Sequence, residues 1–313
     1  MSEVTDPNVW LITGANGNLG KRLVETLLQN PGDAVVAVVR SERAEQTLKS
    51  MRLDAMARER LQVRVLSYTD VDALRAAASG CNKAVHLVGI LKETRQATYA
   101  DAHEASTAAL LQALAGSSVE HLVYMSIVGS SADAGNTCLA SKGAAEDLCR
   151  AHALPTCVLR VPMVLGEGDY ASYALRSRAS KRLSFTFRAA SLEQPIYAGD
   201  VVRAIVAAAM RNLEASVDLG GPEVLSRRDL TERAAAVLHT HGQVVSLPMW
   251  LGRAFAGLLQ SVLGNPPMTV AMLDVLDHDD VIDPENGVAL LGMDPLTPLD
   301  DMLRSVLRDT TLA

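Results

Sequence analysis

Short apolar runs alternate with segments of helical period through the first half of the chain. Strands are predicted at 9–13, 34–40, 62–66, 83–88, 121–126 and 156–161. Helices are predicted between them, from Asn18 onward and over 42–57, 71–79, 99–115 and 139–153. Strands separated by helices are typical of a parallel sheet covered by helices on both faces. The pattern therefore predicts an α/β fold built on a doubly wound parallel sheet.

The rhythm of strands and helices breaks at Gly166-Glu167-Gly168-Asp169, where the chain leaves the predicted sheet. The stretch that follows, up to Glu193, is basic, rich in serine and weakly periodic. An apolar helix over 201–210 and a short strand over 216–219 then bring the chain back to the sheet. We therefore assign 1–165 with 194–220 to a sheet domain, and 166–193 with 221–313 to a smaller lobe that includes the C-terminal segment.

A glycine-rich turn connects the first predicted strand to the first predicted helix. In a turn of this kind the first glycine permits the tight bend, the second lets backbone amides approach phosphate, and the third lets the helix pack closely. The helix adds unpaired N–H groups and the positive end of its dipole. We predict a Rossmann-type dinucleotide site here, with binding residues Gly14, Asn16, Gly17, Asn18, Leu19 and Gly20.

A basic residue closes the second predicted strand. NAD-binding proteins place an acidic residue about 20 positions after the glycine motif, where it accepts the ribose hydroxyls. Arg40 stands in that region, followed by Ser41 and Arg43. A guanidinium forms strong charge-assisted hydrogen bonds with phosphate. The sequence therefore favours NADP(H) over NAD, with Arg40, Ser41 and Arg43 binding the 2′-phosphate; a solvated arginine at a strand end is the alternative.

Composition narrows the range of partners. The 313-residue chain has a net charge of -7 and a sequence pI near 5.5, which disfavours nucleic acid as a partner. Its four cysteines form no CxxC pair, so neither a metal site nor a disulfide framework is predicted. The polar N-terminus and the lack of an apolar run of about 20 residues predict a soluble protein with no transmembrane segment. We expect a reducing, cytoplasmic location.

Further motifs follow in an order that is typical of one superfamily. They are TGANGNLG, HLVG at 86–89, YMSIVG at 124–129, SKGAAE at 141–146 and LRVPMVLGEGD at 159–169. Along nearly its full length the chain resembles the extended and atypical short-chain dehydrogenase/reductase superfamily. It is most similar to the branch containing the NAD(P)H-binding accessory subunit of respiratory complex I and its bacterial relatives. HLVGILKETRQATYADAHEAST and the C-terminal LDVLDHDDVIDPENGVALLGMDPLTPLDDMLRSVL carry that closer similarity.

The resemblance implies further cofactor contacts. Leu87, Val88 and Gly89 would lie beneath the adenine ribose, and Pro162, Met163 and Val164 would meet the carboxamide of the nicotinamide. The family usually has an aspartate after the third strand that contacts the adenine. Ser67 and Tyr68 stand there in this chain, which puts that contact in doubt.

The resemblance also assigns catalytic positions, and one of them is altered. Ser126 matches the residue that orients the substrate carbonyl, and Lys142 matches the lysine that binds the nicotinamide ribose. Four residues before that lysine the family has a tyrosine, which delivers the proton that ketone reduction requires. This chain has Cys138 there. A thiol has a usual pKa of about 8.5, but its side chain is too short to reach the position of a phenol.

These observations leave several functions open. The first is an NADP(H)-binding protein that reduces a small apolar carbonyl or quinone-like molecule. The second is a non-catalytic protein whose bound NADPH stabilises the fold or reports redox state to a protein partner, which the lost tyrosine favours. The third, a nucleotide-sugar epimerase or dehydratase, is disfavoured because those enzymes use the same tyrosine. The oligomeric state is left open.

The segment 247–259 is the most apolar part of the smaller lobe. Trp250, Phe255, Leu258 and Leu259 follow at roughly helical spacing. Packing against the sheet domain is the default interpretation, and a substrate pocket or a membrane or partner contact is the alternative. A membrane-surface helix normally has a lysine-rich polar face, whereas this segment contains Arg253 alone.

Overall fold

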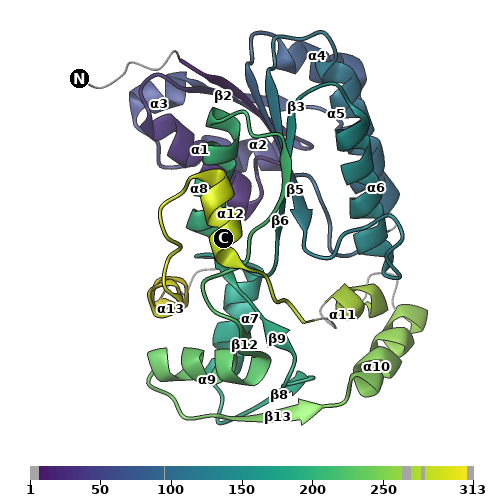
Figure 1. The fold of residues 1–313 in the computed structure, drawn as a ribbon, viewed down its shortest axis with the longest axis vertical. Coiled ribbons are helices and arrows are strands. Elements are labelled where there is room, and N and C mark those ends of the chain that lie inside the picture. The colour runs from purple at the N-terminus through teal and green to yellow at the C-terminus, as the bar shows by residue number, and fades with distance from the viewer. Residues whose placement is uncertain (1–6, 95, 263–268, 276–278, 309–313) are drawn as a thin grey trace.

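The computed structural model describes residues 7–94, 96–262, 269–275 and 279–308 (Figure 1). In these ranges the central sheet is parallel, with strand order β11-β6-β5-β4-β1-β2-β3. Its strands are β1 Val9–Thr13, β2 Ala34–Val39, β3 Leu61–Val65, β4 Lys83–His86, β5 His121–Ile127, β6 Thr156–Val161 and β11 Ala215–Asp218. The strand order reverses between β1 and β4, and ligands bind open α/β sheets at such a switch point. The predicted doubly wound fold is confirmed.

Helices cover both faces of the sheet (Figure 1). One face carries α1 Asn18–Gln29, α2 Glu42–Lys49, α8 Ala198–Met210 and α12 Pro284–Leu291. The other carries α4 Val71–Ala78, a π-helix η1 Ala100–Ala105, α5 Ser106–Leu114 and α6 Thr137–Ala151. Each strand alternates its side chains between the faces. Thus Trp10 and Ile12 pack on the α1 side, and Leu11 packs on the α5 side.

A smaller lobe lies beneath the C-terminal ends of the strands (Figure 1). Its core joins α7 Tyr170–Ala179, α9 Arg227–Val237 and α13 Leu299–Arg308. Three short pairs complete it: β7 Val164–Leu165 with β10 Ile196–Tyr197, β8 Leu183–Phe187 with β13 Gln243–Leu247, and β9 Leu192–Glu193 with β12 Leu225–Ser226. Helices α10 Met249–Val262 and α11 Val270–Val275 lie at its edge.

Several element boundaries differ from the predicted ones for local physical reasons. The single helix expected over 42–57 is two helices, α2 and α3 Ala55–Glu59, because the Asp54 carboxylate accepts the Ala57 N–H at 2.8 Å and starts a new helix. The helix expected over 99–115 begins with the π-helical segment η1. Helix α12 lies in the range assigned to the smaller lobe but packs on the sheet domain through Leu291. No helix within the described ranges has the length and apolar character to cross a membrane.

Candidate functional site

The glycine-rich turn occupies the switch point between β1 and β4, and two of its glycines are sterically required. Gly14 has φ +77°, and a Cβ there would lie 3.0 Å from the Leu87 carbonyl carbon at the end of β4. A Cβ at Gly20 would lie 2.6 Å from the carbonyl oxygens of both Gly14 and Ala15. Helix α1 therefore packs against the turn more closely than any side chain allows, as the glycine spacing predicts.

The N-terminus of α1 presents backbone amides toward the turn. Gly17 is the N-cap, and its carbonyl accepts the Lys21 N–H at 2.8 Å. The amides of Asn18, Leu19 and Gly20 come before this first intrahelical bond and so have no acceptor within the helix. Together with the positive end of the helix dipole, they form an anion site. This set of N–H donors beside the glycine-rich turn fits the pyrophosphate of a dinucleotide.

Tyr68 holds the glycine-rich turn through hydrogen bonds of its hydroxyl group. Its hydroxyl accepts the Gly14 N–H at 3.2 Å and donates to the Val38 carbonyl at 3.3 Å, which ties the turn to β2. Burial raises the pKa of Tyr68, while the Gly14 N–H and the Arg40 charge act in the opposite direction. The sequence identified Tyr68 merely as a departure from the family pattern. Its position directly after β3 was the available signal for this role.

The basic residues predicted to bind a 2′-phosphate lie at the end of β2. Arg40 is exposed, and its guanidinium carbon is 5.6 Å from the centroid of the Tyr68 ring. Ser41 is the N-cap of α2, with its hydroxyl oxygen accepting the Ala44 N–H at 3.3 Å. Arg43 is exposed in the first turn of the same helix. Since β2 adjoins β1, this basic edge is next to the anion site.

Lys142 contacts the segment that follows β4. The Leu87 N–H donates to the Thr13 carbonyl at 3.0 Å, which continues the pairing of β4 with β1. A Cβ at Gly89 would lie 3.3 Å from the Lys142 amine, so the absence of a side chain there leaves room for it. The amine donates to the carbonyls of Val88 at 3.3 Å and Met125 at 2.8 Å. The structure thus places Lys142, predicted to bind the nicotinamide ribose, against Val88 and Gly89, which were predicted to lie beneath the adenine ribose.

Lys142 is buried, and its amine lies 4.7 Å from the centroid of the Tyr124 ring. Burial lowers the pKa of Lys142 to about 8, although Cys138, Cys149 and Glu146 act against this shift. Near neutral pH the lysine therefore changes its charge more easily than an exposed lysine does.

Two buried histidines lie beside Lys142, and the sequence assigned neither a partner. His86 Nδ1 is 2.6 Å from the Thr13 hydroxyl, and its Nε2 is 3.3 Å from the Ser106 hydroxyl. His103 Nε2 accepts the Ile90 N–H at 3.1 Å. Burial, assisted by the Lys142 charge, lowers the pKa of each to about 3. Both rings are therefore neutral and hold the strand ends in place.

Cys138 occupies the position of the family tyrosine and is fully buried. Its thiol packs with Tyr99, Leu139 and Ile127 and donates to the Ile90 carbonyl at 3.6 Å. Burial raises the pKa of Cys138 to about 11, so the thiol stays protonated. Tyr99, which packs against this thiol, donates its hydroxyl proton to the Leu91 carbonyl at 2.9 Å. A buried, weakly acidic thiol is a poor proton donor to a ligand on the sheet edge.

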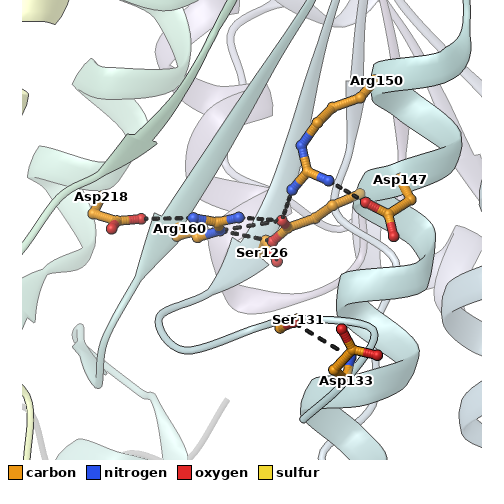
Figure 2. A network of polar contacts seen from close by, with 8 residues as sticks. Ser126, Ser131, Asp133, Asp147, Arg150, Arg160 and Asp218 are labelled. Carbon is orange, nitrogen blue, oxygen red and sulfur yellow. Dashed lines mark hydrogen bonds and ion pairs between the residues drawn. The ribbon is translucent and has the colours of Figure 1, made fainter.

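Ser126 has a different partner from the one that the family resemblance implies. Its hydroxyl donates to the Glu146 carboxylate at 2.6 Å (Figure 2). Arg160 donates to the same carboxylate at 2.9 Å, and Arg150 donates to it at 2.6 Å. Asp218 lies 3.4 Å from Arg160 at the far side of the network. This contact gives Ser126 a structural role, so its carbonyl-orienting role stays a prediction without geometric support.

Pro162, Met163 and Val164 follow β6 along the same edge of the sheet. The Met163 carbonyl accepts the Ile196 N–H at 3.0 Å, which holds this segment against β10. Pro162 is buried, whereas Met163 and Val164 are half-buried. These residues lie at the C-terminal end of β6, and their contact with the carboxamide stays a prediction.

The loop after β7 reaches across to the N-terminus of α1, which the sequence did not predict. Asn18 donates its side-chain amide to the Gly168 carbonyl at 3.2 Å. Arg22 forms a 2.8 Å ion pair with Glu167, whose carboxylate also accepts hydrogen bonds from Tyr197 and Ser305. Glu167 thereby connects α1 to β10 and α13.

The described residues contain no grouping of histidine, cysteine and carboxylate side chains arranged to hold a metal ion. The cysteines at 81, 138, 149 and 157 are all buried thiols.

Comparison with known proteins agrees with this geometry. A family model described as NAD(P)H-binding matches residues 14–212. The chain is 25% identical over 278 residues to the mitochondrial NADH dehydrogenase [ubiquinone] 1 alpha subcomplex subunit 9 of Arabidopsis thaliana, covering 86% of this chain and 68% of that one. It is 23% identical over 290 residues to the 40 kDa subunit of NADH-ubiquinone oxidoreductase of Neurospora crassa, covering 91% and 75%.

A solved structure shows the same fold. UDP-glucuronic acid 4-epimerase from Bacillus cereus, in complex with NAD, superimposes with a TM-score of 0.73 at 18% identity, covering 96% of this chain and 97% of that one. The family match spans more than half of the chain. The chain therefore belongs to the NAD(P)H-binding family, and its resemblance to the branch of complex I accessory subunits is confirmed.

Proposed function

We propose that this chain is an NADP(H)-binding protein in which the dinucleotide stabilises the fold or reports redox state to a protein partner. The observation that carries the proposal is the fully buried Cys138 in place of the family's proton-donating tyrosine. The chain keeps the anion site at α1, but it lacks the tyrosine that delivers a proton when the family reduces a carbonyl. Retained binding without the catalytic donor favours a non-catalytic role.

The preference for NADP(H) rests on the charge at the end of β2. Arg40 is exposed beside the Tyr68 ring, and Arg43 is exposed one turn away. The 2′-phosphate of NADP(H) would accept bidentate hydrogen bonds from Arg40. The ribose of NAD carries no negative charge to accept them. Ser41 would donate its hydroxyl proton while its oxygen continues to cap α2.

The remaining predicted residues would hold the rest of the dinucleotide. The amides of 18–20 would bind the pyrophosphate, 87–89 would lie under the adenine ribose, and 162–164 would face the carboxamide. Lys142 would bind the nicotinamide ribose through the third N–H of its ammonium group, since the carbonyls of Val88 and Met125 accept two. In its reduced form a nicotinamide dinucleotide supplies a hydride.

A reductase acting on a small apolar carbonyl or quinone-like compound is the second candidate. It is favoured by Lys142, whose pKa is lowered to about 8 by burial. A group with a pKa near the working pH transfers protons efficiently. An epimerase or dehydratase is a weaker candidate because the neighbouring sugar epimerases resemble the chain at the level of fold, and their superfamily uses the missing tyrosine.

The partner and the compartment also belong to the proposal. Its curated relatives are named as subunits of a respiratory enzyme, so a protein partner is the first choice. Four buried thiols are compatible with a reducing cytoplasm, which we propose as the location.

The 340 nm absorbance of the reduced dinucleotide tests the choice between binding and catalysis. The purified protein is loaded with NADPH and incubated with a panel of carbonyl compounds and quinones. We expect stoichiometric retention with no substrate-dependent loss of absorbance. Loss of absorbance that depends on both the protein and one compound would instead establish the reductase.

A further inference from the structure

Helix α10 turns most of its apolar side chains away from the protein. Its buried face consists of Met249, Gly252 and Ala256, and a Cβ at Gly252 would lie 2.9 Å from the Phe187 ring. On the opposite side Trp250 is 66% exposed and Phe255 is 53% exposed. This buried face packs against Phe187 of β8 and against α11, which belong to the smaller lobe, rather than against the sheet domain that the default interpretation expected. This packing leaves the largest residues of α10 in solvent.

Strand β8, which contacts α10 through Phe187, carries further exposed apolar side chains. Alternate residues of a strand share a face, so Leu183 and Phe185 lie on the same face as Phe187, which contacts α10. Leu183 is 47% exposed and Phe185 is 56% exposed. We call the resulting surface the aromatic face. It consists of Leu183, Phe185, Trp250, Leu251, Phe255 and Leu258. In Figure 1, β8 lies at the lower end of the smaller lobe and α10 lies to its right.

The sequence segments that carry the aromatic face are basic, whereas the whole chain is acidic. Residues 170–191 contain five basic and no acidic residues, and residues 242–262 contain one arginine and no acidic residue, although the chain carries a net charge of -7. Arg188 and Arg253 form ion pairs with Asp279 and Asp274. Lys181 and Arg182 are exposed directly before Leu183. They supply the basic flank that α10 itself lacks.

This combination is characteristic of one kind of occupant. Tryptophan and other large apolar side chains bind at the boundary between lipid headgroups and acyl chains, and neighbouring lysines and arginines bind anionic headgroups. A second copy of the chain is a poorer fit, because a symmetric contact would bring Lys181 and Arg182 of both copies to one interface. We propose that the aromatic face, with Lys181 and Arg182, is a peripheral docking surface for a bilayer that contains anionic lipids.

Tryptophan fluorescence provides a specific measurement. The chain has two tryptophans. Trp10 is fully buried in β1, so a blue shift on adding vesicles reports Trp250. We expect a blue shift and co-sedimentation with vesicles of phosphatidylcholine mixed with phosphatidylglycerol. Binding to phosphatidylcholine alone should be weaker, and raising the ionic strength from about 0.1 to about 1 M should weaken the anionic binding.

Paired variants separate the contributions of basic and of apolar side chains to membrane binding. Lys181→Gln with Arg182→Gln should lower partitioning onto anionic vesicles about 30-fold, since each charge near the surface contributes roughly a fivefold factor. Phe255→Ser should lower partitioning onto both kinds of vesicle by about tenfold or more. The matched control combines Met56→Ser and Arg64→Gln, two exposed residues far from the aromatic face in sequence, and should change neither. Unchanged circular dichroism and melting temperature would show that each variant is folded.

Two outcomes would overturn the proposal. One is a folded wild-type protein that neither sediments nor shifts its emission with anionic vesicles at low ionic strength. The other is concentration-dependent dimerisation, measured by light scattering and abolished by Phe255→Ser, in a protein that does not bind lipid. That result would assign the aromatic face to contact between copies of the chain.

Discussion

The Ser126 hydroxyl donates to the Glu146 carboxylate at 2.6 Å and thereby joins β5 to α6. Glu146 is fully buried, and Arg160 from β6 donates to both of its oxygens. Removing one member of a buried, hydrogen-bonded charge network leaves the others without partners. A serine that the family pattern places in catalysis therefore acts here as a link between neighbouring elements.

Substitutions in this network should lower stability and leave nucleotide affinity intact. Ser126→Ala should lower the free energy of unfolding by about 1 to 2 kcal/mol, and Glu146→Gln by about 3 kcal/mol or more. Urea denaturation measures both, and Ser67→Ala at an exposed hydroxyl is the control. Ser126→Ala with wild-type stability but weakened NADPH binding would argue against the structural role.

The basic end of β2 should set the cofactor preference. Arg40→Asp removes the proposed phosphate contact and adds a repelling charge, so it should raise the Kd for NADPH by about tenfold or more and change NADH binding far less. Calorimetric titration of both dinucleotides measures this, with exposed Arg64→Asp as the matched control. Equal losses for NADPH and NADH would exclude Arg40 as the 2′-phosphate ligand.

Two glycines of the turn should respond differently to the same methyl group. At Gly20 a Cβ would lie 2.6 Å from two carbonyl oxygens, so Gly20→Ala should destabilise the fold by about 2 kcal/mol or more. At Gly17 a Cβ would lie 3.4 Å from the Gly14 carbonyl oxygen, so Gly17→Ala should retain the fold and weaken nucleotide binding. Melting temperature and titration together distinguish these effects. Similar melting temperatures for the two variants would contradict the packing argument.

The buried histidines should make the protein sensitive to acid. Burial lowers the pKa of His103 to about 3 in the folded chain. As pH falls below about 6.5, His103 therefore becomes protonated in the unfolded chain before it does in the folded one, and the free energy of unfolding decreases. By about pH 5 one such histidine accounts for a loss of about 2 kcal/mol. His103→Gln should therefore flatten the decline in unfolding free energy between about pH 7.5 and 5, whereas exposed His241→Gln should not. An unchanged decline in His103→Gln would show that other groups cause it.

Local patterns predicted much of the fold and the nucleotide end of the site. The apolar runs located the strands, and the glycine spacing located the α1 turn, because backbone sterics leave few alternatives at Gly14 and Gly20. The roles of Ser126 and Tyr68 were not predictable in this way. Each depends on partners distant in sequence, Glu146 for the first and the Gly14 amide for the second. The exposure of Trp250 likewise depends on which face of α10 the Phe187 ring occupies.

The central claim is that the N-terminus of α1, at the switch point between β1 and β4, binds a nicotinamide dinucleotide. Calorimetric titration of the wild-type protein with NADPH tests it most directly, with Gly17→Ala titrated in parallel. The account predicts binding of one NADPH per chain, and weaker binding to a Gly17→Ala variant that is still folded. Absence of heat with both NADPH and NADH, or equal affinity in the two proteins, would contradict it.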